Sequence, residues 1–312
     1  MIMLKGSRNS FLLLIAAVLG LLLVSGCGEQ PEQKESPHNR AAQPFIIGLI
    51  PEQDIFSQKK RYEPVAEYIA DQVGIAVELR ILSRYGNIID NFVSSKLDGA
   101  FFGSFTGALA VRKLGVQPLA RPEWQDGSTT YYGMIFVRKD STIKNVQNMK
   151  GKRFACVDRA TTAGWLLPLY YFKTNGIDDL FTWVGECYYS GTHEDAILDV
   201  LNGKADMGAA KNTVFYRLAK KDRRIIDELE ILTESPKVPA NSLAVAKNVD
   251  PVLREKIRKT LLEMSLNPDG KTILENFGAI KFIPTSEQDY TPVFEYAEAV
   301  GLDLATYDYT NK

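Results

Sequence analysis

Short apolar runs that alternate with helix-like segments are the feature that most constrains how this chain can fold. The apolar run at residues 45–50 stops at Pro51 and predicts a buried strand. Residues 62–73 then place apolar side chains at helical spacing and are followed by Gly74, which is typical of a helix end. Strands that alternate with helices form a mostly parallel sheet that helices cover on both faces. The alternation therefore predicts an α/β fold.

The alternation continues along the chain and restarts near its middle. Further strands are predicted at residues 76–82, 99–102, 131–138, 153–157, 182–189, 207–210 and 242–246, and helices at 87–96, 106–114, 163–174, 194–201, 251–265 and 270–276. Two similar α/β units indicate two lobes, and the length of residues 45–312, at roughly 150 residues per domain, also suggests two domains. Ligands of open α/β sheets bind beyond the carboxyl ends of the strands, so the site is expected in the loops there.

The charge balance excludes several classes of protein. The 312 residues include 37 Lys and Arg against 38 Asp and Glu, and 45% of them are hydrophobic. Disordered chains are poorer in apolar residues, and nucleic-acid-binding domains carry a basic excess. We therefore expect a globular protein without a nucleic-acid partner.

The N-terminus predicts export and a lipid anchor. Lys5 and Arg8 precede the apolar run 11–24, which is shorter than the about 20 residues of a membrane-spanning helix and is typical of a signal peptide. The run ends in Val-Ser-Gly-Cys, which resembles a bacterial lipoprotein signal. Residues 1–26 would then be removed and Cys27 would carry acyl chains, each buried CH₂ stabilising the anchor by about 0.8 kcal/mol. An ordinary signal peptide with an incidental cysteine is the alternative.

A polar segment joins this anchor to the folded part. Residues 28–44 are rich in Gln, Glu and Pro and show no apolar periodicity, so we expect residues 27–44 to form a flexible tether. The folded part then begins at Phe45.

Metal and cofactor chemistry is poorly represented. His193 is the one histidine of residues 45–312, and Cys156 and Cys187 belong to no CxxC pair. The sequence has no GxGxxG motif, and no glycine-rich loop leads into GK[ST]. We expect no metal and no cofactor. The two cysteines fall on predicted strands and are interpreted as small buried apolar residues. A disulfide stays open in an exported protein, although neighbouring parallel strands rarely offer its geometry.

Three junctions between a strand and a helix carry polar groups. They lie at residues 103–106, 160–165 and 190–195 and offer hydroxyls, backbone amides and the His193 imidazole. Unpaired N–H groups and positive partial charge at a helix start bind oxyanions. Each junction alone has a structural alternative: Thr161, Thr162 or Thr192 as a helix cap, and His193 as a satisfied polar residue. Together they predict a site for a small tetrahedral oxyanion in a cleft.

Residues 131–168 and 190–214 resemble the phosphate-, phosphite- and phosphonate-binding proteins of ABC importers, within the type II periplasmic binding-protein superfamily. The resemblance extends over residues 45–290, with weaker support at 83–85 and 238–241. It implies a two-lobed clamshell of mostly parallel sheets with two hinge crossovers and closure on ligand. Lobe 1 would hold residues 45–130 plus 242–312, and lobe 2 residues 131–241.

The resemblance also implies a set of ligand contacts. Thr161 and Thr162 would donate hydroxyl hydrogen bonds to phosphoryl oxygens, the amides of Ala163 and Gly164 would add two more, and His193 would supply a ring N–H. The remaining implied contacts come from Tyr85, Tyr131, Ser104 and Thr106.

Two departures from the family pattern bear on the ligand. Relatives usually carry a third hydroxyl where this chain has Ala163, so one side-chain donor is missing. Members that accept aminoalkylphosphonates hold the ammonium with acidic residues, whereas the matching positions here are Lys211, Asn212 and Asn241. A lysine facing a ligand ammonium is repulsive, so we expect 2-aminoethylphosphonate to bind poorly. The alternative is that Lys211 points to solvent.

The expected function is a lipid-anchored substrate-binding component of an ABC importer that captures phosphonate, phosphite or phosphate and has no enzymatic activity. Its permease and ATPase are implied by the resemblance alone. We expect a monomer held at the cell envelope, in the periplasm or on the outer face of the cytoplasmic membrane. One alternative is a sensor of the same fold that signals to a membrane histidine kinase, and another is an exported hydrolase with His193 as base.

Overall fold

The structure, a computed structural model, describes residues 43–311. The expected signal peptide, Cys27 and most of the tether lie outside the described residues. Within residues 43–311, no helix has the length and apolar character that crossing a bilayer requires.

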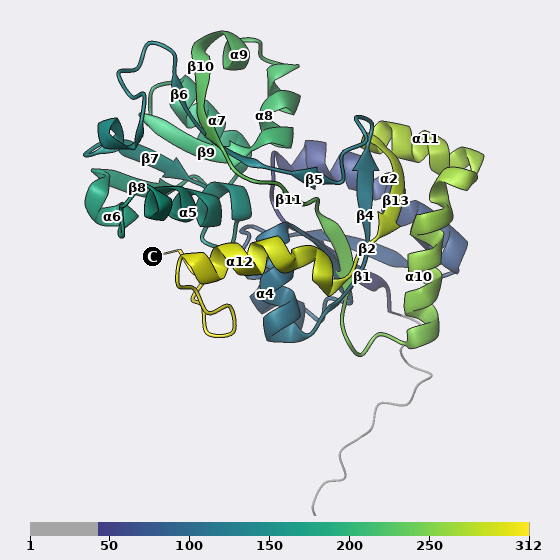
Figure 1. Ribbon diagram of the computed structural model, residues 1–312. Helices are drawn as coiled ribbons and strands as arrows, with labels where there is room; N and C mark the ends of the chain where they lie inside the picture. The colour runs from purple at the N-terminus through teal and green to yellow at the C-terminus, as the bar shows by residue number, and fades with distance from the viewer. Residues whose placement is uncertain (1–42, 312) are drawn as a thin grey trace, which may run out of the picture. The chain divides into compact units, whose positions relative to one another are not determined.

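Lobe 1, as we call the part around the first sheet, contains six strands in the order β13-β4-β12-β3-β1-β2 (Figure 1). Parallel ladders join β1 to β2 and to β3, as strand-helix-strand units require, and the other three ladders are antiparallel. These strands are β1 (Phe45–Leu49), β2 (Val77–Ile81), β3 (Gly99–Phe102), β4 (Gln117–Trp124), β12 (Ser242–Val245) and β13 (Ala279–Pro284).

Helices cover both faces of this sheet, and its central strands β3 and β12 are therefore buried throughout. The helices are α2 (Ile55–Val73), α3 (Asn87–Ser94), α4 (Ser104–Leu114), α10 (Pro251–Glu263), α11 (Pro268–Phe277) and α12 (Thr291–Ala299), with 3-10 turns at Met264–Leu266 and Glu287–Tyr290.

Lobe 2 surrounds a five-stranded sheet with the order β10-β6-β9-β7-β8. Its strands are β6 (Gly133–Arg138), β7 (Arg153–Cys156), β8 (Glu186–Tyr189), β9 (Met207–Lys211) and β10 (Leu229–Glu234). Its helical elements are a 3-10 turn at Val146–Met149, the π-helical turn η3 (Thr162–Leu166), α5 (Leu167–Thr174), α6 (Leu180–Trp183), α7 (His193–Leu201), α8 (Asn212–Ala219) and α9 (Arg224–Glu228).

Two segments carry the chain between the lobes. The first, β5 (Thr130–Tyr131), leads into lobe 2, and the second, β11 (Val238–Pro239), leads back to lobe 1. They pair antiparallel with each other, because each runs in the opposite direction across the same gap (Figure 1). Their pairing holds the two lobes at one edge.

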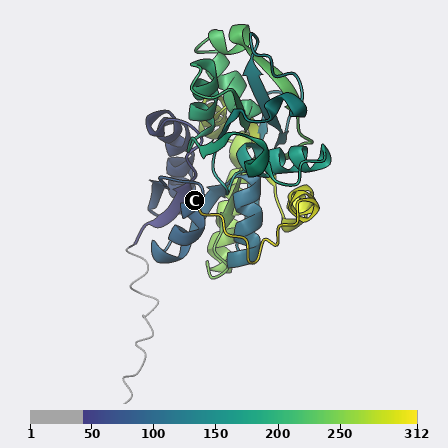
Figure 2. The same ribbon diagram turned by 90° about the vertical axis from the view of Figure 1, so that its left-hand side faces the viewer.

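The C-terminal segment after α12 makes a third connection between the lobes. Trp165 Nε1 donates to the Tyr307 hydroxyl at 2.7 Å, and that hydroxyl donates to the Arg159 carbonyl at 3.0 Å. Asn311 Nδ2 donates to Asp158 Oδ2 at 3.0 Å. Figure 2 shows this yellow C-terminal segment beside the lower edge of the teal and green lobe. Residues of lobe 1 thus pack on the loop that follows β7.

The two-lobed α/β fold with two connecting segments is confirmed, and three local differences have physical causes. Helix α2 begins at Ile55 because Asp54 accepts from the Ser57 amide and so caps an earlier turn. The strand predicted at 182–189 is wrong in its first part, where Asp179 caps the short helix α6. Strands β4 and β13 were not predicted, and they pair only with strands distant in sequence.

Gly107 predicts a measurable packing constraint between α4 and the C-terminal part of lobe 1. A Cβ at this position would lie 2.6 Å from Tyr290 Cε1, and the Tyr290 hydroxyl is held by Ser242 at 2.5 Å. We expect Gly107→Ala to lower the free energy of unfolding by about 1–3 kcal/mol through overpacking. Urea denaturation measures it.

The cause can be checked with a coupled variant. Because Tyr290→Leu removes the ring that the added methyl meets, the double variant should lose less stability than the sum of the two single variants. Additive losses would mean that the ring contact is not the cause.

Candidate functional site

Residues from both lobes meet around the phenol of Tyr131, at the end of β5. The hydroxyl of Ser104, the first residue of α4, donates to the Pro239 carbonyl at 2.7 Å and is hydrogen-bonded to the Tyr131 hydroxyl at 2.9 Å. Burial raises the pKa of Tyr131 to about 12, and the nearby Ser104 and Thr162 hydroxyls oppose this rise. All three side chains are buried. The structure therefore brings together three predicted residues that are far apart in the sequence.

The Thr162 side chain also links the lobes directly. Its Oγ1 accepts a hydrogen bond of 2.8 Å from the Phe105 amide, in the first turn of α4. That amide is one of the unpaired N–H groups that a helix start offers. Thr106, in contrast, donates to the Gly103 carbonyl at 3.1 Å, so its hydroxyl serves the start of its own helix.

The loop before η3 holds the other residues predicted around Thr162. Thr161 occupies the N-cap position of η3, as the capping alternative predicts, but its side chain bonds to no helical amide. Its hydroxyl donates to the Asp158 carbonyl at 2.7 Å instead. Gly164 packs against β7 so closely that a Cβ there would lie 2.4 Å from Val157. The Ala163 methyl faces Gly133, so its amide is what this residue can offer a ligand.

His193 begins α7 and is buried beside the same cluster. Its Nδ1 accepts from the Lys211 amide at 3.3 Å, which leaves Nε2 as the protonated nitrogen of the neutral ring. Burial lowers the pKa of His193 to about 3, so the ring is neutral at physiological pH. Thr192 accepts from the Asp195 amide at 2.9 Å, which confirms the capping alternative for Thr192.

Tyr85 packs edge-on against His193, with ring centroids 5.8 Å apart. Its hydroxyl is buried and has no hydrogen-bond partner among the described residues. Burial raises the pKa of Tyr85 well above its usual range, so the hydroxyl keeps its proton. An unsatisfied buried donor costs about 1–3 kcal/mol, and a ligand oxygen would remove that cost.

Lys211 lies at the end of β9 and enters the junction between the lobes. Its Nζ donates to Glu52 Oε1 at 2.8 Å and to Asn241 Oδ1 at 2.9 Å, and it lies 4.2 Å from the centre of the Tyr131 ring. Lys211 is only 4% exposed. The alternative that it points to solvent is therefore wrong.

Glu52 is a site residue that sequence reasoning missed. Burial alone would raise the pKa of this carboxyl, but Lys211 and Arg217 outweigh burial and hold the pKa at about 2. Burial in turn lowers the pKa of Lys211, and Glu52 opposes that shift. Arg217 donates to Gln53, the next residue. The sequence did offer one indication of Glu52: it lies in the loop directly after the first strand, and loops after strands are where the site was expected.

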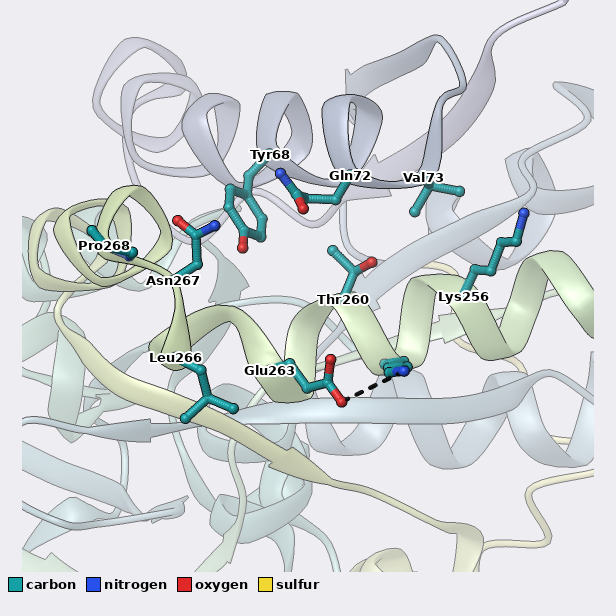
Figure 3. Close-up of a pocket in the computed structure, with 10 residues that line it drawn as sticks. Tyr68, Gln72, Val73, Lys256, Thr260, Glu263, Leu266, Asn267 and Pro268 are labelled. Carbon is teal, nitrogen blue, oxygen red and sulfur yellow. Dashed lines mark ion pairs between the residues drawn. The ribbon is translucent and has the colours of Figure 1, made fainter.

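A large hollow of the surface lies away from the junction between the lobes. With a volume of about 510 Å³, it lies between α2 and α10 on lobe 1, where Tyr68, Gln72 and Thr260 point into it (Figure 3). At its rim, Glu263 pairs with Lys259 along α10 at 3.9 Å. This hollow lies beside helices rather than at strand ends, and it gathers no cluster of buried donors. The junction between the lobes is the better candidate site.

The comparisons with known proteins agree with this placement. A family of periplasmic substrate-binding proteins from phosphonate ABC transporters matches residues 47–290. This chain belongs to that family. It is a substrate-binding protein of an ABC import system, and the family is one of exported transport proteins rather than enzymes. The comparisons support the importer and not the sensor.

Individual relatives are similar over most of their length. The phosphonates-binding periplasmic protein of Escherichia coli is 26% identical over 258 residues, which are 80% of this chain and 75% of the relative. A phosphonate-transporter binding protein from Pseudomonas aeruginosa has a TM-score of 0.75 at 23% identity, covering 81% of this chain and 85% of its own. PhnD1 of Prochlorococcus marinus, solved with methylphosphonate, has a TM-score of 0.72 at 20% identity and covers 82% and 98%.

The burial of neutral His193 predicts how stability depends on pH. Its pKa of about 3 lies below the 6.5 of an ordinary histidine, so between these values the unfolded chain binds a proton that the folded chain does not. The contribution of His193 to the free energy of unfolding is constant above pH 6.5. Below pH 6.5 it falls by roughly 1.4 kcal/mol per pH unit. Urea unfolding at pH 7, 6 and 5 measures the slope.

The His193→Asn variant should lose most of that slope. Glu194→Gln, one position along α7, is the matched control and should keep it. Equal slopes for the wild type and His193→Asn would contradict the assignment of a buried neutral imidazole.

Proposed function

We propose that this chain captures a small phosphorus oxyanion between its lobes and delivers it to an ABC permease with its ATPase. The observation that carries the proposal is the convergence of buried donors on one junction. Tyr85 offers a hydroxyl without a partner among the described residues, and His193 offers a neutral ring N–H. The Thr162 hydroxyl, which accepts from the Phe105 amide, lies in the same junction. Such donors suit an anion whose oxygens accept in several directions.

The electrostatics of the junction support an anion as the ligand. Three helices, α4, η3–α5 and α7, begin at Ser104, Thr162 and His193, so their positive ends meet near one another. Lys211 and Arg217 add two cations beside the carboxylate of Glu52, while the carboxylate of Asp158 lies on the side of Tyr85. We assign ligand contacts to Thr161, the amides of Ala163 and Gly164, Ser104 and Tyr131 as well, with Thr106 supporting the start of α4.

The expected lipid anchor completes the proposal. A family member that acts outside the cytoplasm must stay near its permease, and acylated Cys27 followed by a polar tether would keep it at the membrane surface. We propose that the chain works as a monomer in this position.

Ligand-induced stabilisation tests the binding function. The purified chain should melt higher in the presence of one of phosphate, phosphite or methylphosphonate, by about 2.7 kcal/mol of stability at 100 times the dissociation constant. Thr162→Ala should abolish the shift, because it removes a hydroxyl donor and frees the Phe105 amide. Differential scanning fluorimetry with sulfate as the competing oxyanion is the measurement.

Thr174→Ala is the matched control on the helix that follows. Its hydroxyl donates to the Tyr170 carbonyl and is exposed, so the ligand shift should persist. No shift with any phosphorus compound would overturn the proposed ligand class.

The pair of Lys211 and Glu52 predicts the choice among phosphonates. Lys211 Nζ already pairs with the Glu52 carboxylate, which is the group that a ligand ammonium would need as its partner. We therefore expect 2-aminoethylphosphonate to bind more weakly than methylphosphonate. Lys211→Ser should free Glu52 and shift the ratio of the two dissociation constants toward 2-aminoethylphosphonate by about tenfold to a hundredfold. Isothermal titration calorimetry measures both constants.

The variant Glu52→Gln with Lys211→Ser is the control, since it removes the carboxylate as well. In this double variant, the ratio of the two dissociation constants should not shift toward 2-aminoethylphosphonate. A wild-type protein that binds the two phosphonates equally would contradict the role given to Lys211.

A further inference from the structure

Two cysteines of lobe 2 lie in contact on neighbouring strands. Cys156 ends β7, and Cys187 lies opposite Phe154 in the parallel ladder with β8. Because Phe154 and Cys156 are two residues apart in a strand, both cysteines point to the same face of the sheet. Their Sγ atoms are 2.8 Å apart. Both cysteines are free thiols in this structure, and their contact places the two sulfur atoms where a disulfide can form with little movement of the strands.

The surroundings favour a disulfide over the other roles of a cysteine pair. Among residues 43–311, no group of three His, Cys, Asp or Glu side chains is placed to hold a metal ion. Cys156 is fully buried, which excludes it as an exposed nucleophile. Cys187 is partly exposed on β8, the edge strand of the sheet (Figure 1). One thiol is thus accessible to an oxidant, and the other lies directly behind it.

We propose that Cys156 and Cys187 form a disulfide in the exported protein. The family acts outside the cytoplasm, where disulfides form and persist. The chain has three cysteines, and the third, Cys27, is the residue whose thiol the proposed lipid anchor uses. Cys156 and Cys187 are therefore the two cysteines that can pair with each other.

The oxidation balances as thiol-disulfide exchange with an exported disulfide compound, RS–SR. The Cys187 thiolate attacks one sulfur of RS–SR, and a mixed disulfide forms while RS⁻ leaves. Cys156 then loses its proton and attacks the Cys187 sulfur, and the second RS⁻ leaves. Two cysteine thiols are oxidised to one disulfide, and RS–SR is reduced to two RSH with the two protons released.

The bond would fix the part of lobe 2 that carries the proposed ligand loops. The Ser190 amide and hydroxyl both donate to the Cys156 carbonyl at 2.9 Å, and the Gly191 amide donates to the Val157 carbonyl at 2.9 Å. Strands β7 and β8 therefore end side by side, one leading to Thr162 and the other to His193. A covalent link between the strands would hold these two residues at a constant separation.

The test uses the full chain produced with its own signal segment in an exporting host. Envelope fractions are denatured in iodoacetamide, digested without reductant and analysed by mass spectrometry. We expect one peptide pair joined through Cys156 and Cys187, which reductant separates. Recovery of both cysteines as alkylated peptides would overturn the proposal.

A stability measurement checks the same bond independently. Reductant should lower the Tm of the wild-type chain by about 5–10 °C, because a disulfide restrains the unfolded chain. The Cys156→Val and Cys187→Val double variant is the matched control, and reductant should leave its Tm unchanged. An equal response of the two proteins would contradict the proposal. Ligand-induced melting shifts are scored separately, so failure of this inference leaves the proposed oxyanion binding untouched.

Discussion

The ammonium group of Lys211 is the constraint around which the junction between the lobes is organised. A charge buried without a partner costs several kcal/mol, so the fold has to supply a counter-charge and hydrogen-bond acceptors where this side chain enters. Glu52 and Asn241 supply them from two separate segments of lobe 1. Because Lys211 belongs to lobe 2, the pair can form only when the lobes meet. The closed arrangement and the burial of this charge therefore depend on each other.

Other polar groups of the junction satisfy one another in the same way. The Phe105 amide bonds to Thr162, and Ser104 bonds to Tyr131, in each case across the two lobes. A ligand has to replace these internal hydrogen bonds with hydrogen bonds of its own. Its binding free energy is therefore the difference between the bonds that it makes and the bonds that it breaks. A group with several strong acceptors, such as a phosphoryl oxyanion, makes that difference favourable more readily than a neutral solute. The Tyr85 hydroxyl has no hydrogen-bond partner among the described residues, so a ligand oxygen that bonds to it displaces no protein hydrogen bond.

The structure brings several residues that the sequence predicts as ligand contacts to one junction, but the sequence did not reveal the counter-charge there. Ser104, Thr162 and His193 were predicted because hydroxyls and an imidazole lie at strand ends, and Tyr131 because the family resemblance implies it. Glu52 was missed because an acidic residue after a strand is usually solvated, and nothing local shows that it faces a lysine 159 positions away. The same limit applied to β4 and β13, whose partners lie far along the chain. The strand predicted at 182–189 was wrong in its first part for a local reason, because Asp179 caps a short helix there.

The sequence by itself determined the α/β alternation, the two units and the loops at which binding residues gather, because apolar periodicity and helix-end residues act over a few neighbouring positions. Only the tertiary structure decided which of those residues face one another. It paired Lys211 with Glu52, gave Thr162 an amide from the opposite lobe, left the Tyr85 hydroxyl without a partner, and brought Cys156 against Cys187. These outcomes depend on distances between segments that are remote in the chain, and such distances are fixed by how the sheets and lobes pack rather than by any local pattern.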